Sequence, residues 1–177
     1  MTGIQTCALP ISRLGGEAHL FAGPRSTPQL SFTVRHLSAQ AGVVITASHN
    51  PSHDNGFKCC LGDGGQVTPP ADGAIVAEVA KLGPAEVADF LDKDLAAVLT
   101  VDAAAEEAYL ARLVAGAVDP EAVARHAPRV IYTNLHGTGD VMVEPALRRL
   151  GIDPHLVEEQ REHDGAFPTV ASPNPEN

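Results

Sequence analysis

Tryptophan is absent from this sequence, and phenylalanine and tyrosine together supply only 4% of its 177 residues. The core must therefore be built mainly from Ala, Val, Leu and Ile, within a hydrophobic fraction of 44%. Basic residues are also few, because 12 Lys and Arg stand against 22 Asp and Glu, a formal net charge of −10. This balance argues against a nucleic-acid partner, which usually requires a basic patch. The composition as a whole indicates a globular chain.

Cysteine patterns that form disulfide frameworks or zinc sites are missing as well. The three cysteines are Cys7 and the adjacent pair Cys59 and Cys60, which is neither an even set nor a Cys-x-x-Cys pair. No run of 18 apolar residues exists, and the N-terminus lacks the basic and apolar regions of a signal peptide. We therefore expect a cytoplasmic protein that has no membrane partner.

The two ends of the chain differ from the middle. Residues 1–11 resemble the translation of a common sequencing-adapter oligonucleotide, so we expect residues 1–20 to be a non-native or disordered leader. A frayed natural terminus is the alternative. Near the other end, Asn174-Pro175-Glu176 is typical of a helix start, with an N-cap, a proline and an acid in the first turn. We expect this helix to be truncated.

Helical and strand patterns alternate between these ends. They predict a helix up to Ala41 with Gly42 just beyond its end, a buried strand of the parallel kind over 43–46, a strand over 57–61, a helix over 71–82 and a largely helical stretch over 83–116. In that last stretch an apolar stripe is formed by Tyr109, Leu110, Leu113 and Val114, whereas Glu106 and Glu107 are expected to face solvent.

The later part of the chain predicts a β-α-β unit. Its strands are expected over 130–133 and 152–157, and its helix over 140–150. We therefore predict an α/β fold in which a mixed, mainly parallel sheet is layered with helices. A change of composition over 116–128 predicts two consecutive similar domains, residues 21–118 and 119–177, both incomplete.

Ser48 directly follows the strand predicted over 43–46, where open α/β sheets place ligand-binding loops. Gly-x-Ser-x-Gly is absent, which disfavours a hydrolase. The run Thr46-Ala47-Ser48-His49-Asn50-Pro51, followed by Asn55-Gly56-Phe57-Lys58, closely resembles the active-site loop of the α-D-phosphohexomutases, the phosphoglucomutase and phosphomannomutase superfamily. The likeness continues in Ser26-Thr27-Pro28, Gly64-Gly65-Gln66-Val67, Leu135-His136-Gly137-Thr138-Gly139, Phe167-Pro168-Thr169-Val170 and Pro173-Asn174-Pro175-Glu176.

This resemblance implies a sugar-phosphate mutase that works through a phosphoserine. Ser48 would carry the phosphoryl group, Lys58 would act as general acid and base on the substrate hydroxyl, and His49 would orient the loop and donate to phosphoryl oxygens. Thr46, Asn50 and Asn55 complete the expected substrate and phosphate loop, in which the two asparagines hold the turn geometry. The expected partners are small sugar phosphates.

The same resemblance implies Mg²⁺, bound to the phosphoryl group of Ser48, and a sugar 1,6-bisphosphate as activator. The Asp-Gly-Asp-x-Asp-Arg loop that supplies the main magnesium ligands in the family is missing from this sequence. We therefore expect a fragment that is inactive alone. Phosphopentomutase and phosphoglucosamine mutase remain alternatives, as does a noncatalytic fragment. The Gly137-Thr138-Gly139 turn either offers amides to an anion or is a tight interdomain turn.

Overall fold

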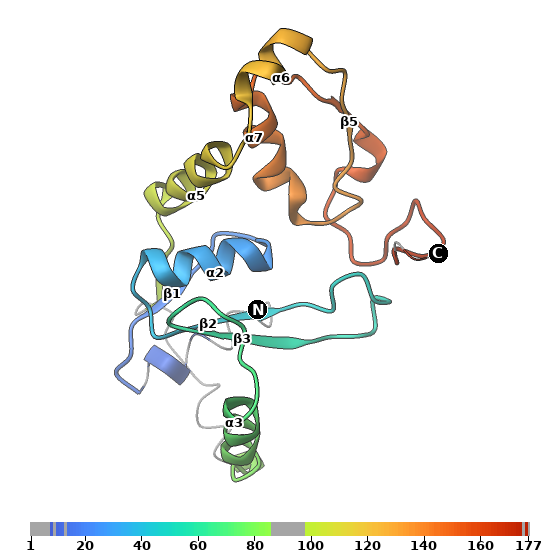
Figure 1. Ribbon diagram of the computed structural model, residues 1–177. Coiled ribbons are helices and arrows are strands. Elements are labelled where there is room, and N and C mark those ends of the chain that lie inside the picture. The colour runs from blue at the N-terminus through green and yellow to red at the C-terminus, as the bar shows by residue number, and fades with distance from the viewer. Residues whose placement is uncertain (1–7, 9, 13, 86–97, 175, 177) are drawn as a thin grey trace. The chain divides into compact units, whose positions relative to one another are not determined.

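The structure is a computed structural model that describes residues 8, 10–12, 14–85, 98–174 and 176. Contacts divide the chain into two compact units (Figure 1). The described residues of the first unit run up to Gly23, from Leu30 to Ile45 and from Phe57 to Asp102; those of the second are 24–29, 46–56, 103–174 and 176. The small sheets and their helices confirm the predicted α/β class.

The first unit contains a two-stranded parallel sheet. β1 (Ala18–Leu20) pairs with β4 (Val98–Thr100), with Ala18 opposite Val98. The sequence analysis missed both strands, and the helical prediction over 83–116 is wrong for residues 98–100. A strand of three residues is too short to show a period, and only pairing with a distant segment defines it. Residues 86–97 of the same predicted stretch lie outside the described residues.

The second sheet of this unit is an antiparallel hairpin. β2 (Ala41–Ile45) pairs with β3 (Phe57–Leu61), and Val43 lies opposite Cys59. The strand over 57–61 is therefore confirmed. The expectation of a parallel strand buried on both faces is wrong, because β2 pairs with the very next strand and its side chains are half-buried or exposed. Turn signals between the strands return the chain directly, and they outweigh the continuous apolar run.

Helix α2 (Thr27–His36) packs on this hairpin through Gly42. A Cβ on Gly42 would lie 2.5 Å from Cγ2 of Val34 and 3.1 Å from Cδ1 of Leu30. Gly42 was expected to end the helix, and that prediction is wrong. Ser38 ends it in the left-handed region (φ 52°), where the Ala39 N–H donates to the Val34 carbonyl at 2.9 Å. Glycine is needed at 42 for close packing.

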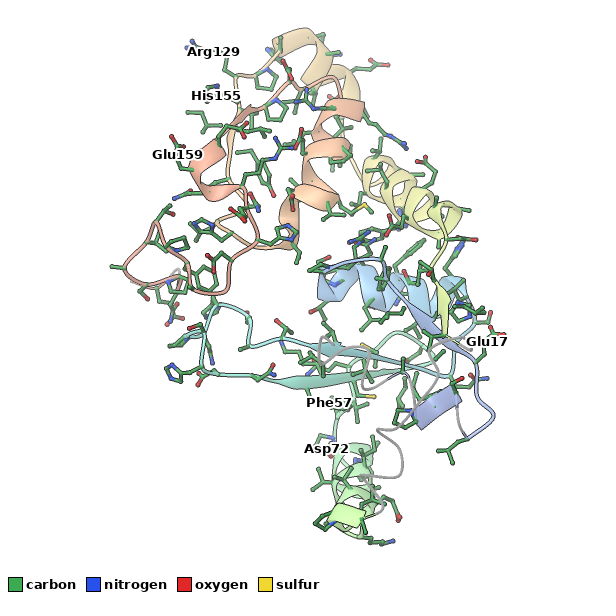
Figure 2. The ribbon with its side chains drawn as sticks, turned by 180° about the vertical axis from the view of Figure 1, so that it is seen from behind. Glu17, Phe57, Asp72, Arg129, His155 and Glu159 are labelled. Carbon is green, nitrogen blue, oxygen red and sulfur yellow. The ribbon has the colours of Figure 1, made fainter. Side chains whose placement is uncertain are left out.

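Helix α3 (Ala71–Val79) confirms most of the helix predicted over 71–82. Its apolar side chains are not buried: Val76 is 66% exposed and Val79 61% exposed. Phe57 at the start of β3 is similarly exposed (Figure 2). None of the described helices has both the length and the apolar composition needed to cross a membrane.

The second unit contains the predicted β-α-β arrangement. β5 (Ile131–Tyr132) and β6 (His155–Leu156) are parallel, with Ile131 opposite His155. Between them run the 3₁₀ turn η2 (Thr138–Val141) and helix α7 (Val143–Arg149). Gly151 closes α7 at φ 82°, as the sequence predicts. A further short 3₁₀ turn, η3 (Glu158–Gln160), follows β6.

Helix α5 (Ala103–Ala115) packs against α7 and buries Tyr109 and Leu110, which confirms that part of the apolar stripe, whereas Leu113 is 38% exposed. Of the two acids on this helix, Glu107 is exposed as predicted, but Glu106 is not. The Arg25 guanidinium lies 2.6 Å from Glu106 Oε1, and this Arg25 side chain is only 13% exposed. The expectation of a solvent-facing Glu106 is wrong, because a partner from a distant segment covers it, and sequence periodicity carries no information about such a partner.

The short helix α6 (Pro120–His126) lies in the segment where the sequence predicts a domain boundary. Asp119 caps it by accepting a hydrogen bond from the Ala122 N–H at 2.8 Å. Asp119-Pro120-Glu121 has the same N-cap, proline and acid order as the predicted helix start near the C-terminus. At that C-terminal position the Glu176 N–H donates to Asn174 Oδ1 at 3.0 Å, as an N-cap requires.

Candidate active site

The Ser48 loop, residues 46–56, connects β2 to β3 and is closed at its neck by backbone contacts. The Thr46 N–H donates to the Gly56 carbonyl at 2.9 Å. On Gly56 a Cβ would collide with the Thr46 carbonyl oxygen, so only glycine fits here. The Asn-Gly pair in the resemblance therefore has a local physical reason: it lets the two sides of the neck approach closely.

Ser48 lies exposed at the start of this loop in the left-handed region, with φ 58°. Its backbone N–H donates to Thr46 Oγ1 at 3.0 Å, and its Oγ lies 3.3 Å from His49 Nδ1. A serine is uncommon in this conformation, and such residues persist where the surroundings hold them. The loop thus presents the Ser48 hydroxyl to solvent beside an imidazole nitrogen.

The two predicted asparagines hold the loop through short-range bonds. The Asn50 N–H donates to the Ala47 carbonyl at 3.0 Å, and its side-chain amide donates to Asp54 Oδ2 at 3.2 Å. Asn55 Oδ1 accepts the Gly56 N–H at 2.9 Å. Sequence reasoning missed Asp54, whose spacing of four residues from Asn50 carries no helical meaning across Pro51.

Lys58 lies in β3 opposite Val44, just beyond the Ser48 loop, and is half-buried. The structure brings Thr46, Ser48 and His49 together through the bonds given above. It places Lys58 on the neighbouring strand rather than within this set of bonds. The predicted role of Lys58 therefore rests on its place in the motif.

A magnesium site is not formed by the described side chains alone. Among them, no group of three or more His, Cys, Asp or Glu is arranged to hold a metal ion. Proteins usually bind Mg²⁺ through one or two carboxylates and substrate phosphates. The one carboxylate of the Ser48 loop, Asp54, is already bonded to Asn50 and lies 3.6 Å from His53 Nε2. The donor set therefore does not fit a resident Mg²⁺ site in the described part of the chain.

A second loop, residues 133–137, repeats the local geometry of the Ser48 loop; we call it the His136 loop. The Leu135 N–H donates to Thr133 Oγ1 at 2.9 Å, as Ser48 does to Thr46. The Gly137 N–H donates to the Asn134 carbonyl at 2.8 Å, as Asn50 does to Ala47, and Leu135 is left-handed at φ 47°. A Thr-x-x-His spacing after a strand is the sequence signal common to both loops.

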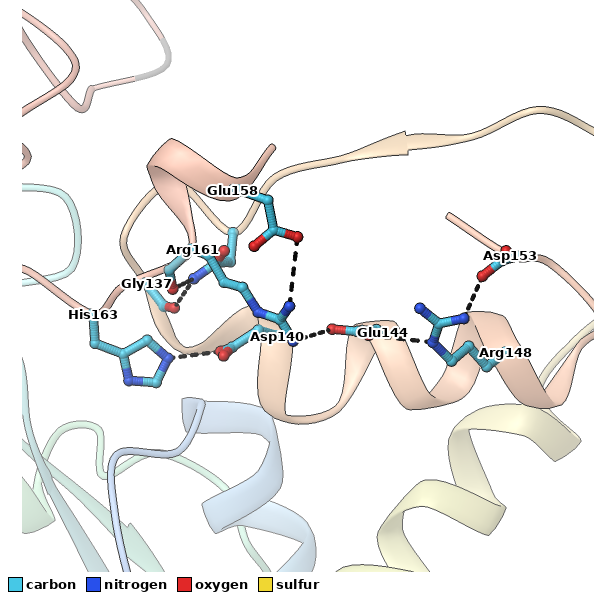
Figure 3. Close-up of polar contacts among 9 residues, drawn as sticks. Gly137, Asp140, Glu144, Arg148, Asp153, Glu158, Arg161 and His163 are labelled. Atoms are coloured by element: carbon cyan, nitrogen blue, oxygen red, sulfur yellow. Dashed lines mark hydrogen bonds and ion pairs between the residues drawn. The ribbon is translucent and has the colours of Figure 1, made fainter. Parts of the chain in front are cut away.

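Charged pairs tie the segment after β6 to α7 and η2 (Figure 3). Arg161 lies 3.0 Å from Glu144, and His163 lies 2.6 Å from Asp140. Burial, with Asp140 and Glu144 nearby, raises the pKa of Tyr132 at the end of β5. Tyr132, Asp140, Glu144 and Arg161 line a shallow depression. Because both carboxylates are already bonded to side chains of the segment after β6, this network stabilises the fold and leaves these two groups engaged.

Comparison with known families gives two matches to this chain. Residues 7–86 match the family model described as phosphoglucomutase/phosphomannomutase, alpha/beta/alpha domain I. Residues 107–177 match the model for alpha/beta/alpha domain II of the same family. The first match contains the Ser48 loop, and the second contains the His136 loop.

Individual proteins show the same likeness. The chain is 36% identical to a “Probable phosphomannomutase” of Haemophilus influenzae over 166 residues, which are 92% of this chain and 33% of that protein. It is 32% identical to human phosphopentomutase over 166 residues, 92% of this chain and 27% of that protein. A crystal structure of a “putative phosphomannomutase” from Thermus thermophilus matches with a TM-score of 0.68 at 28% identity, covering 97% of this chain and 36% of that one. The chain thus spans about a third of the length of these proteins.

Proposed function

Because the chain belongs to the phosphoglucomutase/phosphomannomutase family, we propose that it is the phosphoryl-carrying part of a sugar-phosphate mutase. The observation that carries this proposal is the Ser48 loop, which holds an exposed serine hydroxyl 3.3 Å from His49 Nδ1. The mutase interconverts the 1-phosphate and 6-phosphate of a hexose through a bisphosphorylated sugar. The 1,6-bisphosphate also serves as the activator that first loads Ser48.

In the first transfer, the bond from phosphorus to Ser48 Oγ breaks and a bond from phosphorus to a sugar hydroxyl oxygen forms. Lys58 accepts the proton of that hydroxyl, and Ser48 Oγ is released as an oxyanion. In the second transfer a bond forms from Ser48 Oγ to the other phosphorus of the bisphosphate, the bond from that phosphorus to the sugar oxygen breaks, and Lys58 returns the proton to the sugar oxygen. His49 donates a hydrogen bond to the phosphoryl oxygens. This chemistry depends on positioning and charge neutralisation, which suits a short, closed loop.

Phosphorylation would place about −1.5 to −2 charges on Ser48 and supply new acceptor oxygens. Those oxygens are the ligands that this chain would offer to Mg²⁺. The described residues supply no carboxylate set for the metal, so the other ligands must come from outside them.

Two sugar classes compete as substrate. The family descriptions and the phosphomannomutase relative favour a hexose phosphate. The 32% identity to human phosphopentomutase makes a pentose phosphate the second candidate. A phosphoglucosamine mutase and a noncatalytic fragment are the remaining alternatives. We expect the 177-residue chain alone to show no turnover of glucose 1-phosphate with magnesium.

Intact-mass measurement after incubation with glucose 1,6-bisphosphate tests the assignment. In a longer chain that carries the metal loop, we expect a gain of the mass of one phosphoryl group, and Ser48→Ala in that chain to gain none. Ser52→Ala, which changes another exposed serine of the same loop, is the matched control and should be labelled like the parent. Peptide mapping that placed the group away from Ser48 would refute the proposal. Absence of incorporation in a longer chain that carries the metal loop would refute it as well.

A further inference from the structure

The His136 loop is connected to residues 158–170, which we call the strap, by a continuous chain of side-chain hydrogen bonds. Its bonds are Leu135 N to Thr133 Oγ1 at 2.9 Å, Thr133 Oγ1 to Gln160 Oε1 at 2.8 Å, Gln160 Nε2 to Thr169 Oγ1 at 3.1 Å, Thr169 Oγ1 to His136 Nε2 at 2.9 Å and His136 Nδ1 to the Glu162 carbonyl at 2.9 Å. Each group in this series of hydrogen bonds has a defined partner.

The partners fix the direction of the last of these bonds and of the two bonds that Gln160 makes. A carbonyl oxygen only accepts, so His136 Nδ1 must carry the proton that it shares with Glu162. Gln160 Oε1 also only accepts, so the Thr133 hydroxyl donates to it. The amide end of Gln160 then donates to Thr169 Oγ1.

These directions place a proton on Nδ1 of His136. The other ring nitrogen, Nε2, lies 2.9 Å from the Thr169 hydroxyl, which can donate to it or accept from it. The His136 residue is only 5% exposed, so both contacts of its ring are shielded from water. The ring therefore joins the Glu162 carbonyl to the Thr169 hydroxyl inside the fold.

The loop that this chain of bonds holds is strained. Leu135 and His136 are consecutive left-handed residues, with φ 47° and 61°, and neither is glycine. Each such residue is strained unless its surroundings compensate. The strap supplies the compensation, because the His136 N–H donates to the Gln160 carbonyl at 2.8 Å and the Asp164 N–H donates to the His136 carbonyl at 3.1 Å.

We propose that His136 is a positioning residue whose ring, with a proton on Nδ1, locks the strained His136 loop to the strap. This loop follows β5 at the carboxyl edge of a parallel pair, the place where α/β folds bind ligands. Strained residues that their surroundings over-determine are typical of such places. The inference goes beyond phosphoryl transfer at Ser48 and does not depend on it.

Nuclear magnetic resonance of the 177-residue chain, with ¹⁵N in its histidine rings, tests the proposal directly. Long-range ¹H–¹⁵N spectra should show the His136 ring protonated on Nδ1. Thr169→Val removes the hydroxyl with little change of shape, and should speed hydrogen exchange at the His136 and Asp164 amides about tenfold, the equivalent of roughly one hydrogen bond. Thr169→Ser keeps the hydroxyl and should restore both exchange rates.

Thr68→Val is the matched control, because Thr68 is exposed and lies outside the chain of bonds. It should leave the His136 spectrum and both amides unchanged. A ring protonated on Nε2 only would overturn the proposal. Unchanged exchange in Thr169→Val would do the same. None of these readouts involves phosphoryl transfer, so they stand apart from the test of Ser48.

Discussion

The Ser48 loop and the His136 loop begin alike and are supported in opposite ways. Each has a threonine that accepts an N–H two residues later, a left-handed residue at that position, and then a histidine. The bonds that shape the Ser48 loop lie within residues 46–56, and both Ser48 and His49 are exposed. In the His136 loop the histidine is buried and bound to the strap.

This difference separates the loop that we propose as the reactive one from a loop whose histidine is held in place. Local bonds hold the shape of the Ser48 loop and leave its hydroxyl and imidazole exposed to solvent. Long-range bonds occupy both ring nitrogens of His136, so that histidine has no free position for chemistry. The two loops therefore share one turn geometry and differ in the burial of the histidine, which is exposed at His49 and buried at His136.

The largest expected contrast lies in the two histidines. His136→Ala leaves the Glu162 carbonyl and the Thr169 hydroxyl without their partner, and should lower the free energy of unfolding by about 3 kcal/mol. His49→Ala, at an exposed position, should change it by less than about 0.5 kcal/mol. Urea denaturation of the two variants measures both effects. Equal losses would remove the distinction between the loops.

Gly56 tests how tightly the Ser48 loop is closed. Gly56→Ala forces a Cβ against the Thr46 carbonyl and should cost about 2 kcal/mol, or open the neck of the loop. Gly73→Ala is the control, because a Cβ there meets nothing within 4 Å and alanine favours helix α3. It should stabilise the chain by roughly 0.5–1 kcal/mol. A tolerated Gly56→Ala with unchanged phosphorylation of Ser48 would show that the closed neck is dispensable.

The threonines compare the shared turn itself. Thr133→Val removes two hydrogen bonds, to Leu135 and to Gln160, and should cost about 1–2 kcal/mol. Thr46→Val removes the one to Ser48 and should cost about 0.5–1 kcal/mol. Serine at either position keeps the hydroxyl and should recover most of the loss in denaturation experiments. A larger loss at Thr46 would contradict the view that local bonds alone support the Ser48 loop.

Sequence reasoning located the Ser48 loop well because its features are local. The order of Thr46, Ser48 and Asn55 along the chain is enough to place them in one loop. In the structure Ser48 is bonded to Thr46 at the start of this loop, and Asn55 is bonded to Gly56 at its end. Strand β3 was predictable for the same reason, and so was the helix of the β-α-β unit, which ends at Gly151. A short-range pattern determines each of them.

The features that sequence reasoning missed depend on partners far away in the chain. β1 and β4 define each other only when paired, and Glu106 has a partner in Arg25. The bonds of His136 to Glu162 and Thr169 are likewise invisible in a local pattern, although the repeated Thr-x-x-His spacing marks the loop itself. Single-sequence patterns carry little information about such tertiary pairing.

The smallest expected effect concerns an exposed ion pair that joins helix α5 to helix α7. Arg149 on α7 binds Glu107 on α5 through two bonds of 2.6 Å, and this hydrogen bonding lowers the pKa of Glu107 below its usual 4.5. A lowered pKa in the folded state stabilises the chain above the unfolded value, and this contribution is lost as the pH falls through the folded value. The advantage of the parent over Glu107→Gln in urea should therefore be full at about pH 7, disappear in strong acid, and shrink with added salt because the pair is exposed. An advantage that grew on acidification would mean that Arg149 does not hold Glu107 in its charged form.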